Sequence, residues 1–216
     1  MTLKIREPGS AITHFIAMLL ALFSAAPLLV RTSLRSGSTS LAAMSVFICS
    51  MILLYGASTL YHSVNASGKI IRIFKKLDHM MIFILIAGTY TPVCLITLKG
   101  PFGFLLLAAV WGIALTGIII KACWISCPKW FSSALYISMG WICLSVFGTL
   151  WKLLPHAAFF WLLAGGIIYT AGGIIYALKL PIFNARHKFF GSHEIFHLFV
   201  MAGSLCHFIF MFVYLA

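Results

Sequence analysis

Long apolar stretches separated by short polar segments dominate the pattern of hydrophobic and polar positions along this chain. A transmembrane α-helix needs about 20 consecutive, predominantly apolar residues, and seven stretches reach or nearly reach that length. Pro92 interrupts the third stretch, where we expect a kink. We predict an all-α polytopic membrane protein, a bundle of seven transmembrane helices that forms one domain over residues 1–216. The predicted helices cover residues 11–30, 41–61, 79–98, 101–122, 130–151, 155–178 and 193–215.

The composition also indicates a membrane protein. Hydrophobic residues make up 62% of the 216 residues and charged residues only 8%, whereas a soluble domain carries about 25% charged residues. The formal net charge of +12 comes from basic residues that are scattered between the apolar stretches. We interpret them as topology signals and as contacts to anionic lipid head groups, so we expect membrane lipids and no nucleic acid as partners.

The basic residues predict the direction in which the helices cross the membrane. Positive residues favour the cytoplasmic side. If the seven helices alternate in direction, eleven Lys and Arg residues lie on the side of the N-terminus and four on the other side. We therefore predict a cytoplasmic N-terminus and an external C-terminus. The eleven are Lys4, Arg6, Lys69, Arg72, Lys75, Lys76, Lys121, Lys129, Lys179, Arg186 and Lys188; the four are Arg31, Arg35, Lys99 and Lys152.

Histidine and acidic side chains gather at the predicted cytoplasmic helix ends. Ionisable groups at membrane depth are costly and usually functional. His62 closes the second predicted helix, with Ser58 one turn before it, and Asp78 opens the third. His193 and His197 open the seventh helix one turn apart, which is the spacing that two imidazoles need to bind one metal ion. Three neutral imidazoles with one open position are typical of a catalytic zinc site.

Residues 193–197 also read His-Glu-x-x-His, the string of the zincin metalloproteases, in which the glutamate acts as general base. A zincin takes a further metal ligand from elsewhere in the chain, but no acidic residue follows Glu194. Glu194 is also rotated by about 100° around the helix from His193. We therefore favour His62 as the third zinc ligand, beside His193 and His197, over the protease interpretation.

Four sequence segments carry a resemblance to a known family. They are "REPGSAITH" (6–14), "STLYHS" (58–63), "KLDHMMIFILIAGTYTP" (76–92) and "SHEIFHLF" (192–199). Together they resemble the hemolysin III family, the bacterial branch of the progestin and adipoQ receptors, which include the adiponectin receptors. The resemblance covers almost the whole chain, and it implies a seven-helix bundle in a bacterial plasma membrane with a cytoplasmic N-terminus.

The resemblance also implies roles for particular residues. It implies that zinc is bound by His62, His193 and His197, and that Ser58 and Asp78 lie around the water at the metal. The receptors have Gln at the position of Glu194, which makes the match to the metalloprotease string incidental.

Three functions remain open at this point. The first is a zinc-dependent hydrolase, such as a ceramidase-like amidohydrolase, that cleaves a lipid amide or ester at the cytoplasmic face of the membrane, with Asp78 as the proton acceptor and Ser58 orienting the water or the substrate carbonyl. The second is a non-enzymatic, receptor-like regulator in which zinc cross-links helices. The third is a cytolysin, which the family name implies. We rank them in that order.

Some ionisable residues also have simpler interpretations. A lone histidine at a membrane interface is usually an amphipathic residue, and we interpret His14, His79, His156, His187 and His207 in this way. The alternative is that His14 and Glu7 pack near the metal site. For Asp78, the alternative to a catalytic role is a salt bridge with Lys75 or Lys76.

Overall fold

The computed structural model describes residues 5–178 and 191–216. Within these ranges, seven helical segments are long and apolar enough to cross a membrane, in agreement with the predicted seven-helix bundle. α5 and α6 belong to one segment and are joined by the short helix η2 (Trp141–Val146). The helices are α1 (Pro8–Arg35), α2 (Ser38–Ser63), α3 (Gly68–Pro92), α4 (Gly100–Cys123), α5 (Lys129–Gly140), α6 (Phe147–Leu153), α7 (His156–Leu178) and α8 (Ser192–Phe210).

The third helix begins earlier than predicted. α3 starts at Gly68 and not at residue 79, so the basic residues from Lys69 to Lys76 lie on the helix. Asp78 therefore lies about three turns inside α3 instead of opening it. The apolar pattern misses this extension because a helix that projects beyond the hydrocarbon region needs no apolar residues there.

The same span changes its helical form at Pro92. Proline has no N–H to donate, and the next six residues, Val93–Leu98, form a π-helical segment, η1. The Lys99 N–H then donates to the carbonyl of Cys94 at 3.1 Å, just before α4 begins. The site of the expected kink is thus the point where α-helical geometry ends.

The fifth span is not one continuous helix, contrary to the prediction for residues 130–151. α5 ends at Gly140, and a 3-10 segment separates it from α6. Tyr90 of α3 explains the break, because its hydroxyl donates to the Gly140 carbonyl at 2.7 Å and accepts from the Cys143 N–H at 2.8 Å. A side chain from another helix thus occupies backbone groups that would otherwise pair within an α-helix.

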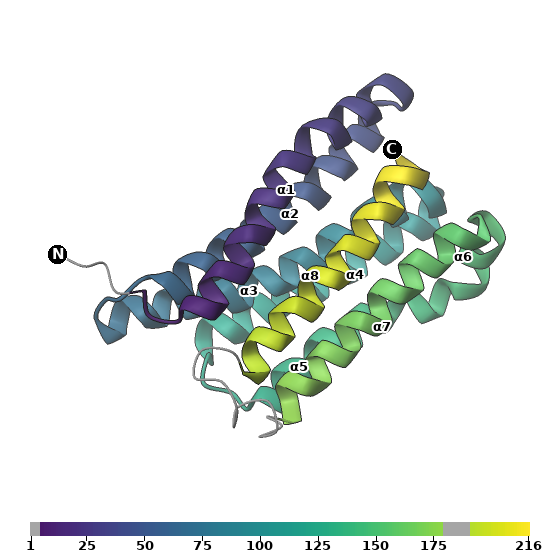
Figure 1. The fold of residues 1–216 in the computed structure, drawn as a ribbon. Helices are drawn as coiled ribbons and strands as arrows, with labels where there is room; N and C mark the ends of the chain where they lie inside the picture. The colour runs from purple at the N-terminus through teal and green to yellow at the C-terminus, as the bar shows by residue number, and fades with distance from the viewer. Residues whose placement is uncertain (1–4, 179–190) are drawn as a thin grey trace.

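The helices form a closed arrangement because α8, the last helix, packs against both α1 and α7. α1 packs on α2, α2 on α3, and α3 on α4, while α5 packs on α7. α8 contacts both α7 and α1, and Figure 1 shows it in yellow between them. The side chains packed between these helices are mainly apolar.

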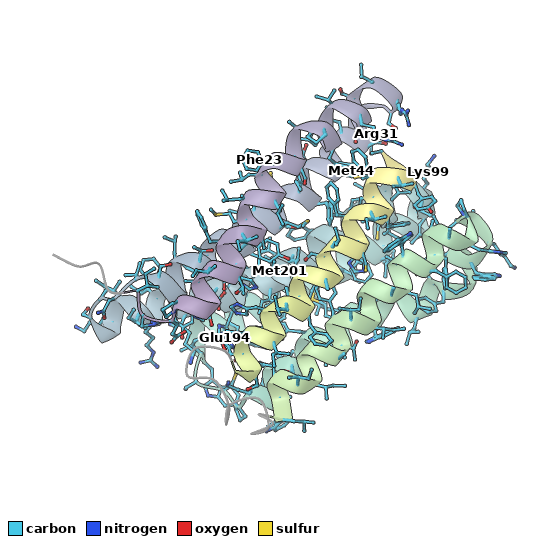
Figure 2. All side chains as sticks on the ribbon, viewed as in Figure 1. Phe23, Arg31, Met44, Lys99, Glu194 and Met201 are labelled. Carbon is cyan, nitrogen blue, oxygen red and sulfur yellow. The ribbon has the colours of Figure 1, made fainter. Side chains whose placement is uncertain are left out.

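The two ends of the bundle carry different side chains. We call the end that holds the start of α1, the end of α2 and the start of α8 the N-terminal end. Figure 2 shows Glu194 there, whereas Arg31 and Lys99 lie at the opposite end. This sidedness brings the candidate metal ligands of α2 and α8 to the same level.

Candidate metal centre

Three histidines meet at the N-terminal end of the bundle. His62 lies in the last turn of α2, and His193 and His197 lie in the first two turns of α8. Each offers a ring nitrogen, and the three nitrogens lie within 4.8 Å of one another. His62 and His197 are buried, being 1% and 2% exposed. The one-turn spacing found in the sequence therefore does bring two imidazoles of α8 to the imidazole of α2.

The spacing of the nitrogens fits a metal with tetrahedral coordination. The Nε2 atoms of His62 and His193 are 3.3 Å apart. Two nitrogens that each lie at about 2.0–2.1 Å from a tetrahedral zinc are roughly 3.3–3.4 Å apart. Imidazole is also a common ligand of zinc and of other transition metals. His62 and His193 thus have the separation of two ligands of one such ion, and the ring of His197 offers a third nitrogen within 4.8 Å.

The first turns of α1 hold two of these rings in place. The carboxylate of Glu7, just before α1, accepts a hydrogen bond from Nδ1 of His62. Thr13 Oγ1 lies 3.2 Å from Nδ1 of His197 and itself donates to backbone carbonyls of α1, so it accepts from that ring. A neutral imidazole that donates from Nδ1 has its lone pair on Nε2, so both contacts favour the tautomer that can bind a metal, as is usual for the outer partners of metal-binding histidines.

The pKa of Glu7 reflects this contact. The hydrogen bond from His62 is the main reason that the pKa of the Glu7 carboxyl is lower than usual, although partial burial acts in the opposite direction. Glu7 is therefore ionised at neutral pH. An anionic carboxylate behind an imidazole raises the basicity of the nitrogen that faces the metal.

Glu194 has a different task from the glutamate of a metalloprotease. One of its oxygens accepts from Ser10 Oγ at 2.5 Å, and the other accepts from the Gly191 N–H at 2.8 Å. The second contact satisfies a backbone donor at the start of α8. Because both oxygens are occupied in this way, Glu194 ties α1 to α8 and caps its own helix, which agrees with the expectation that the metalloprotease string is incidental.

Ser58 and Asp78 border the same cavity as His197, one of the three histidines of the cluster. A cavity of about 170 Å³ extends between the helices, and Ser58, Asp78, His14 and His197 all line it. Ser58 is fully buried, and its hydroxyl has no hydrogen-bond partner among the described residues. Asp78 is 7% exposed. The structure thus brings Ser58, Asp78 and His197 to one cavity from three separate helices, while His62 and His193 are not among the residues that line it.

The surroundings of Asp78 differ from the simple alternative considered above. Among the described residues, Nδ1 of His79 lies 3.4 Å from the Asp78 carboxylate, and no ion pair joins Asp78 to Lys75 or Lys76. The lysines of α3 therefore do not pair with this carboxylate, and Asp78 lines the cavity.

His14 and Glu7 are the residues that the sequence interpretation placed least well. His14 is 3% exposed and stacks on His197 with ring centroids 3.6 Å apart, so the interfacial interpretation of His14 is wrong and the alternative is confirmed. Neither ring nitrogen of His14 has a partner among the described residues. The only signal for this placement is the segment "REPGSAITH", because no helical spacing relates α1 to α2 or α8.

The remainder of the cavity is mainly apolar. Its wall comes mostly from α2, α3, α5, α6, α7 and α8 and continues to residues at the opposite end of the bundle, including Leu150 and Phe159. Such a space is suited to a hydrocarbon chain, since apolar surface favours apolar surroundings.

The fold and the histidine cluster define a seven-span membrane protein with a buried site that could hold a metal ion. Residues 3–208 match the family described as Haemolysin-III related, and the chain belongs to this family. The resemblance drawn from the four sequence segments is thereby confirmed.

Individual relatives cover most of the chain. Hemolysin-3 of Bacillus cereus is 40% identical over 198 residues, which are 92% of this chain and 86% of the relative. The Hemolysin-3 homolog of Bacillus subtilis (strain 168) is 37% identical over 198 residues, 92% of this chain and 89% of the relative. More distantly, the adiponectin receptor protein of Drosophila melanogaster is 25% identical over 237 residues, 94% of this chain but only 49% of that protein.

Proposed function

We propose that this protein is a zinc-dependent hydrolase that cleaves an amide or ester bond of a membrane lipid at the cytoplasmic face. The observation that carries the proposal is the cluster of His62, His193 and His197, which adjoins a mainly apolar cavity lined by His197, Ser58 and Asp78. Three histidines leave one position of a tetrahedral metal open, as in catalytic zinc sites.

The three histidines would hold the ion, which would polarise the carbonyl of the substrate and lower the pKa of a water molecule to about 7. The residues of the chain do the remaining work. The Asp78 carboxylate accepts the proton of the attacking water and returns it to the leaving group. The free hydroxyl of Ser58 orients the water or the scissile carbonyl, and the apolar wall holds the acyl chain of the lipid.

A site at this position favours a substrate that comes from the bilayer. The N-terminal end corresponds to the cytoplasmic side if the positive residues set the orientation. A lipid head group at that interface would meet the histidine cluster, while its chain would extend along the cavity. The amide or ester bond between them is the part that reaches Ser58 and Asp78.

One observation favours a second function, a non-enzymatic regulator. The cluster joins α2 to α8, and α1 contributes contacts to both through Glu7 and Thr13. A metal here would therefore tie three helices together. The open fourth position argues against this function, because structural zinc usually has four protein ligands.

The test combines metal content with turnover. The protein is purified in mild detergent, metals per chain are measured by mass spectrometry, and a panel of lipid amides and esters is screened. We expect one zinc per wild-type chain, none in His193→Ala/His197→Ala, and hydrolysis only with zinc bound. In Asp78→Asn we expect zinc to remain and kcat to fall about 10²- to 10⁴-fold.

Two results would contradict the proposal. Wild-type protein without zinc after purification in zinc-containing buffer would remove its basis. Wild-type protein with zinc and no turnover on any amide or ester would favour the regulator, particularly if zinc removal lowered the unfolding temperature.

A further inference from the structure

His207 lines the same cavity as His197 of the candidate metal centre but lies far from it along α8. The side chain is 7% exposed, so the interfacial interpretation of His207 is wrong. It follows His197 by ten positions, which is about 15 Å along the axis at 1.5 Å per residue. Half of the hydrocarbon thickness is also about 15 Å. His207 therefore lies at the depth that the distal part of an acyl chain from one leaflet reaches.

The hydrogen bond of His207 fixes which ring nitrogen carries the proton. Nε2 lies 3.2 Å from the carbonyl oxygen of Leu162, and a carbonyl can only accept, so Nε2 carries the hydrogen. A neutral imidazole then has a lone pair on Nδ1. A doubly protonated ring would place a charge in an apolar cavity at considerable cost. Nδ1 of His207 is thus a hydrogen-bond acceptor.

This acceptor is buried and has no partner among the described residues. Of the described residues that line the cavity, only His14, Ser58 and His207 have such unpartnered buried atoms. His14 and Ser58 are at the metal centre. The polar groups near His207 are paired, since the hydroxyls of Tyr55 and Tyr169 both bond to Ser204 Oγ.

The ring of His207 packs closely against Gly165 of α7. A Cβ at position 165 would lie 2.3 Å from atoms of the His207 ring, so only glycine leaves room for it there. Tyr169 also packs against this ring in an edge-to-face arrangement, with ring centroids 5.3 Å apart. A polar ring is thus held at a position where an apolar side chain would avoid the cost of an unpaired acceptor.

We propose that the cavity binds an acyl chain with a hydroxyl group in its distal half, and that this hydroxyl donates a hydrogen bond to Nδ1 of His207. The inference rests on the proposed function, because it assigns the substrate class of the same cavity. The head of the lipid lies at the metal centre and the hydroxyl about 15 Å away.

The chemistry of the acceptor favours a hydroxyl over other polar groups. A carboxylate or a carbonyl has no hydrogen to donate to Nδ1. An ammonium group would bring a charge into the apolar cavity. A hydroxyl donates one hydrogen bond and adds little to the width of a hydrocarbon chain.

The test compares the binding of fatty acids, the acyl products expected from hydrolysis, and so needs no turnover. Dissociation constants are measured for octadecanoic acid and for the same acid with a hydroxyl on its twelfth or on its second carbon. The variants are His207→Leu, which removes the acceptor, and His207→Gln, whose amide N–H can donate to Leu162 while its oxygen accepts. Thermal unfolding checks that both variants are folded.

We expect wild-type protein to bind the acid hydroxylated at the twelfth carbon about two- to tenfold more tightly than the other two, as one neutral hydrogen bond predicts. His207→Gln should keep the preference, and His207→Leu should bind all three acids about equally. Equal binding in the wild type, or an unchanged preference in His207→Leu, would overturn the inference.

The result can be separated from the test of the proposed function. The ratio of dissociation constants depends on the chain, so it should persist in His193→Ala/His197→Ala even if both affinities fall. A ratio of one together with intact zinc and turnover would refute the hydroxyl site alone. A preserved ratio in wild-type protein that neither binds zinc nor hydrolyses lipids would refute the hydrolase alone.

Discussion

Glu7 lies outside the candidate ligand set but contacts one of its histidines directly. It lies before α1, yet its carboxylate bonds to Nδ1 of His62 on α2. The backbone supports this contact, because the Glu7 N–H donates to the His62 carbonyl at 3.0 Å. Outer partners of this kind fix the orientation of the ring, and their loss typically costs 10- to 100-fold in metal affinity.

We therefore expect Glu7→Ala to weaken zinc binding about 10- to 100-fold, as measured by competition with a chromophoric chelator. The matched control is Glu194→Gln, because the other glutamate at this end bonds to Ser10 and Gly191 and not to a histidine. It should bind zinc as the wild type does. Equal affinities for wild type and Glu7→Ala would show that His62 is not a ligand or needs no support.

Lys121 and Cys127 form a second polar cluster. The Lys121 side chain is fully buried, and Nζ donates to Cys127 Sγ at 3.0 Å and to Ser132 Oγ at 2.5 Å. The chain has only three acidic residues, and each has a polar partner elsewhere. Burial by itself raises the pKa of the Cys127 thiol, but the hydrogen bonds from Ser132 and Lys121 bring the pKa below its usual value.

Because the thiolate is the nucleophilic form of cysteine, Cys127 should react with iodoacetamide at lower pH than an ordinary thiol. Lys121→Met removes the ammonium group, so the pH profile of alkylation should move upward and the rate at pH 7 should fall severalfold. Lys152→Met, at an exposed position of α6, is the control and should leave the profile unchanged. Peptide mass spectrometry reads Cys127 separately from the other cysteines. An unaltered profile in Lys121→Met would mean that the lysine does not stabilise the thiolate.

The sequence predicts residues at this scale only where helical spacing relates them. His193 and His197 are one turn apart, and Ser58 is one turn before His62, so local geometry groups them. Helical spacing cannot relate His14 or His207 to any of these, since their neighbours lie on other helices. Their burial depends on tertiary packing.

At the scale of elements, apolar length predicts the spans well and their interior poorly. The seven predicted stretches correspond to the seven spans. The break after α5 depends on Tyr90 of α3, and the apolar pattern of residues 130–151 contains no sign of it. Helix ends that project beyond the hydrocarbon region, such as the start of α3, are missed because the prediction detects only apolar residues.

Close approach between α3 and α4 gives a test of packing. A Cβ at Gly117 would lie 2.3 Å from the ring of Phe83, which is buried. Gly117→Ala should therefore destabilise the protein by about 1–3 kcal/mol. Gly112 of the same helix is exposed, and a Cβ added there would meet no atom within 4 Å. Gly112→Ala should leave stability unchanged or raise it by up to about 1 kcal/mol. Thermal unfolding in detergent measures both, and equal unfolding temperatures would contradict the close packing.

At the scale of the whole molecule, the distribution of positive charge is the feature that relates the bundle to the membrane. The described residues hold seven Lys and Arg residues of the richer side, among them Arg6 and Lys129, and all four of the other side, among them Arg31 and Lys99. Figure 2 shows Arg31 and Lys99 at the end opposite Glu194. Four of the eleven residues of the richer side, Lys4, Lys179, Arg186 and Lys188, lie outside the described residues.

The excess of positive residues at the N-terminal end of the bundle predicts that this end, with the histidine cluster, faces the cytoplasm. Alkaline phosphatase, which is active only outside the cytoplasm, should thus be active when fused after Ala216 and inactive when fused after Ala66, between α2 and α3. A fluorescent protein that folds only in the cytoplasm should give the reverse pattern at the same two positions. If phosphatase activity instead followed the Ala66 fusion, the histidine cluster would face outward, and a lipid substrate would have to come from the outer leaflet.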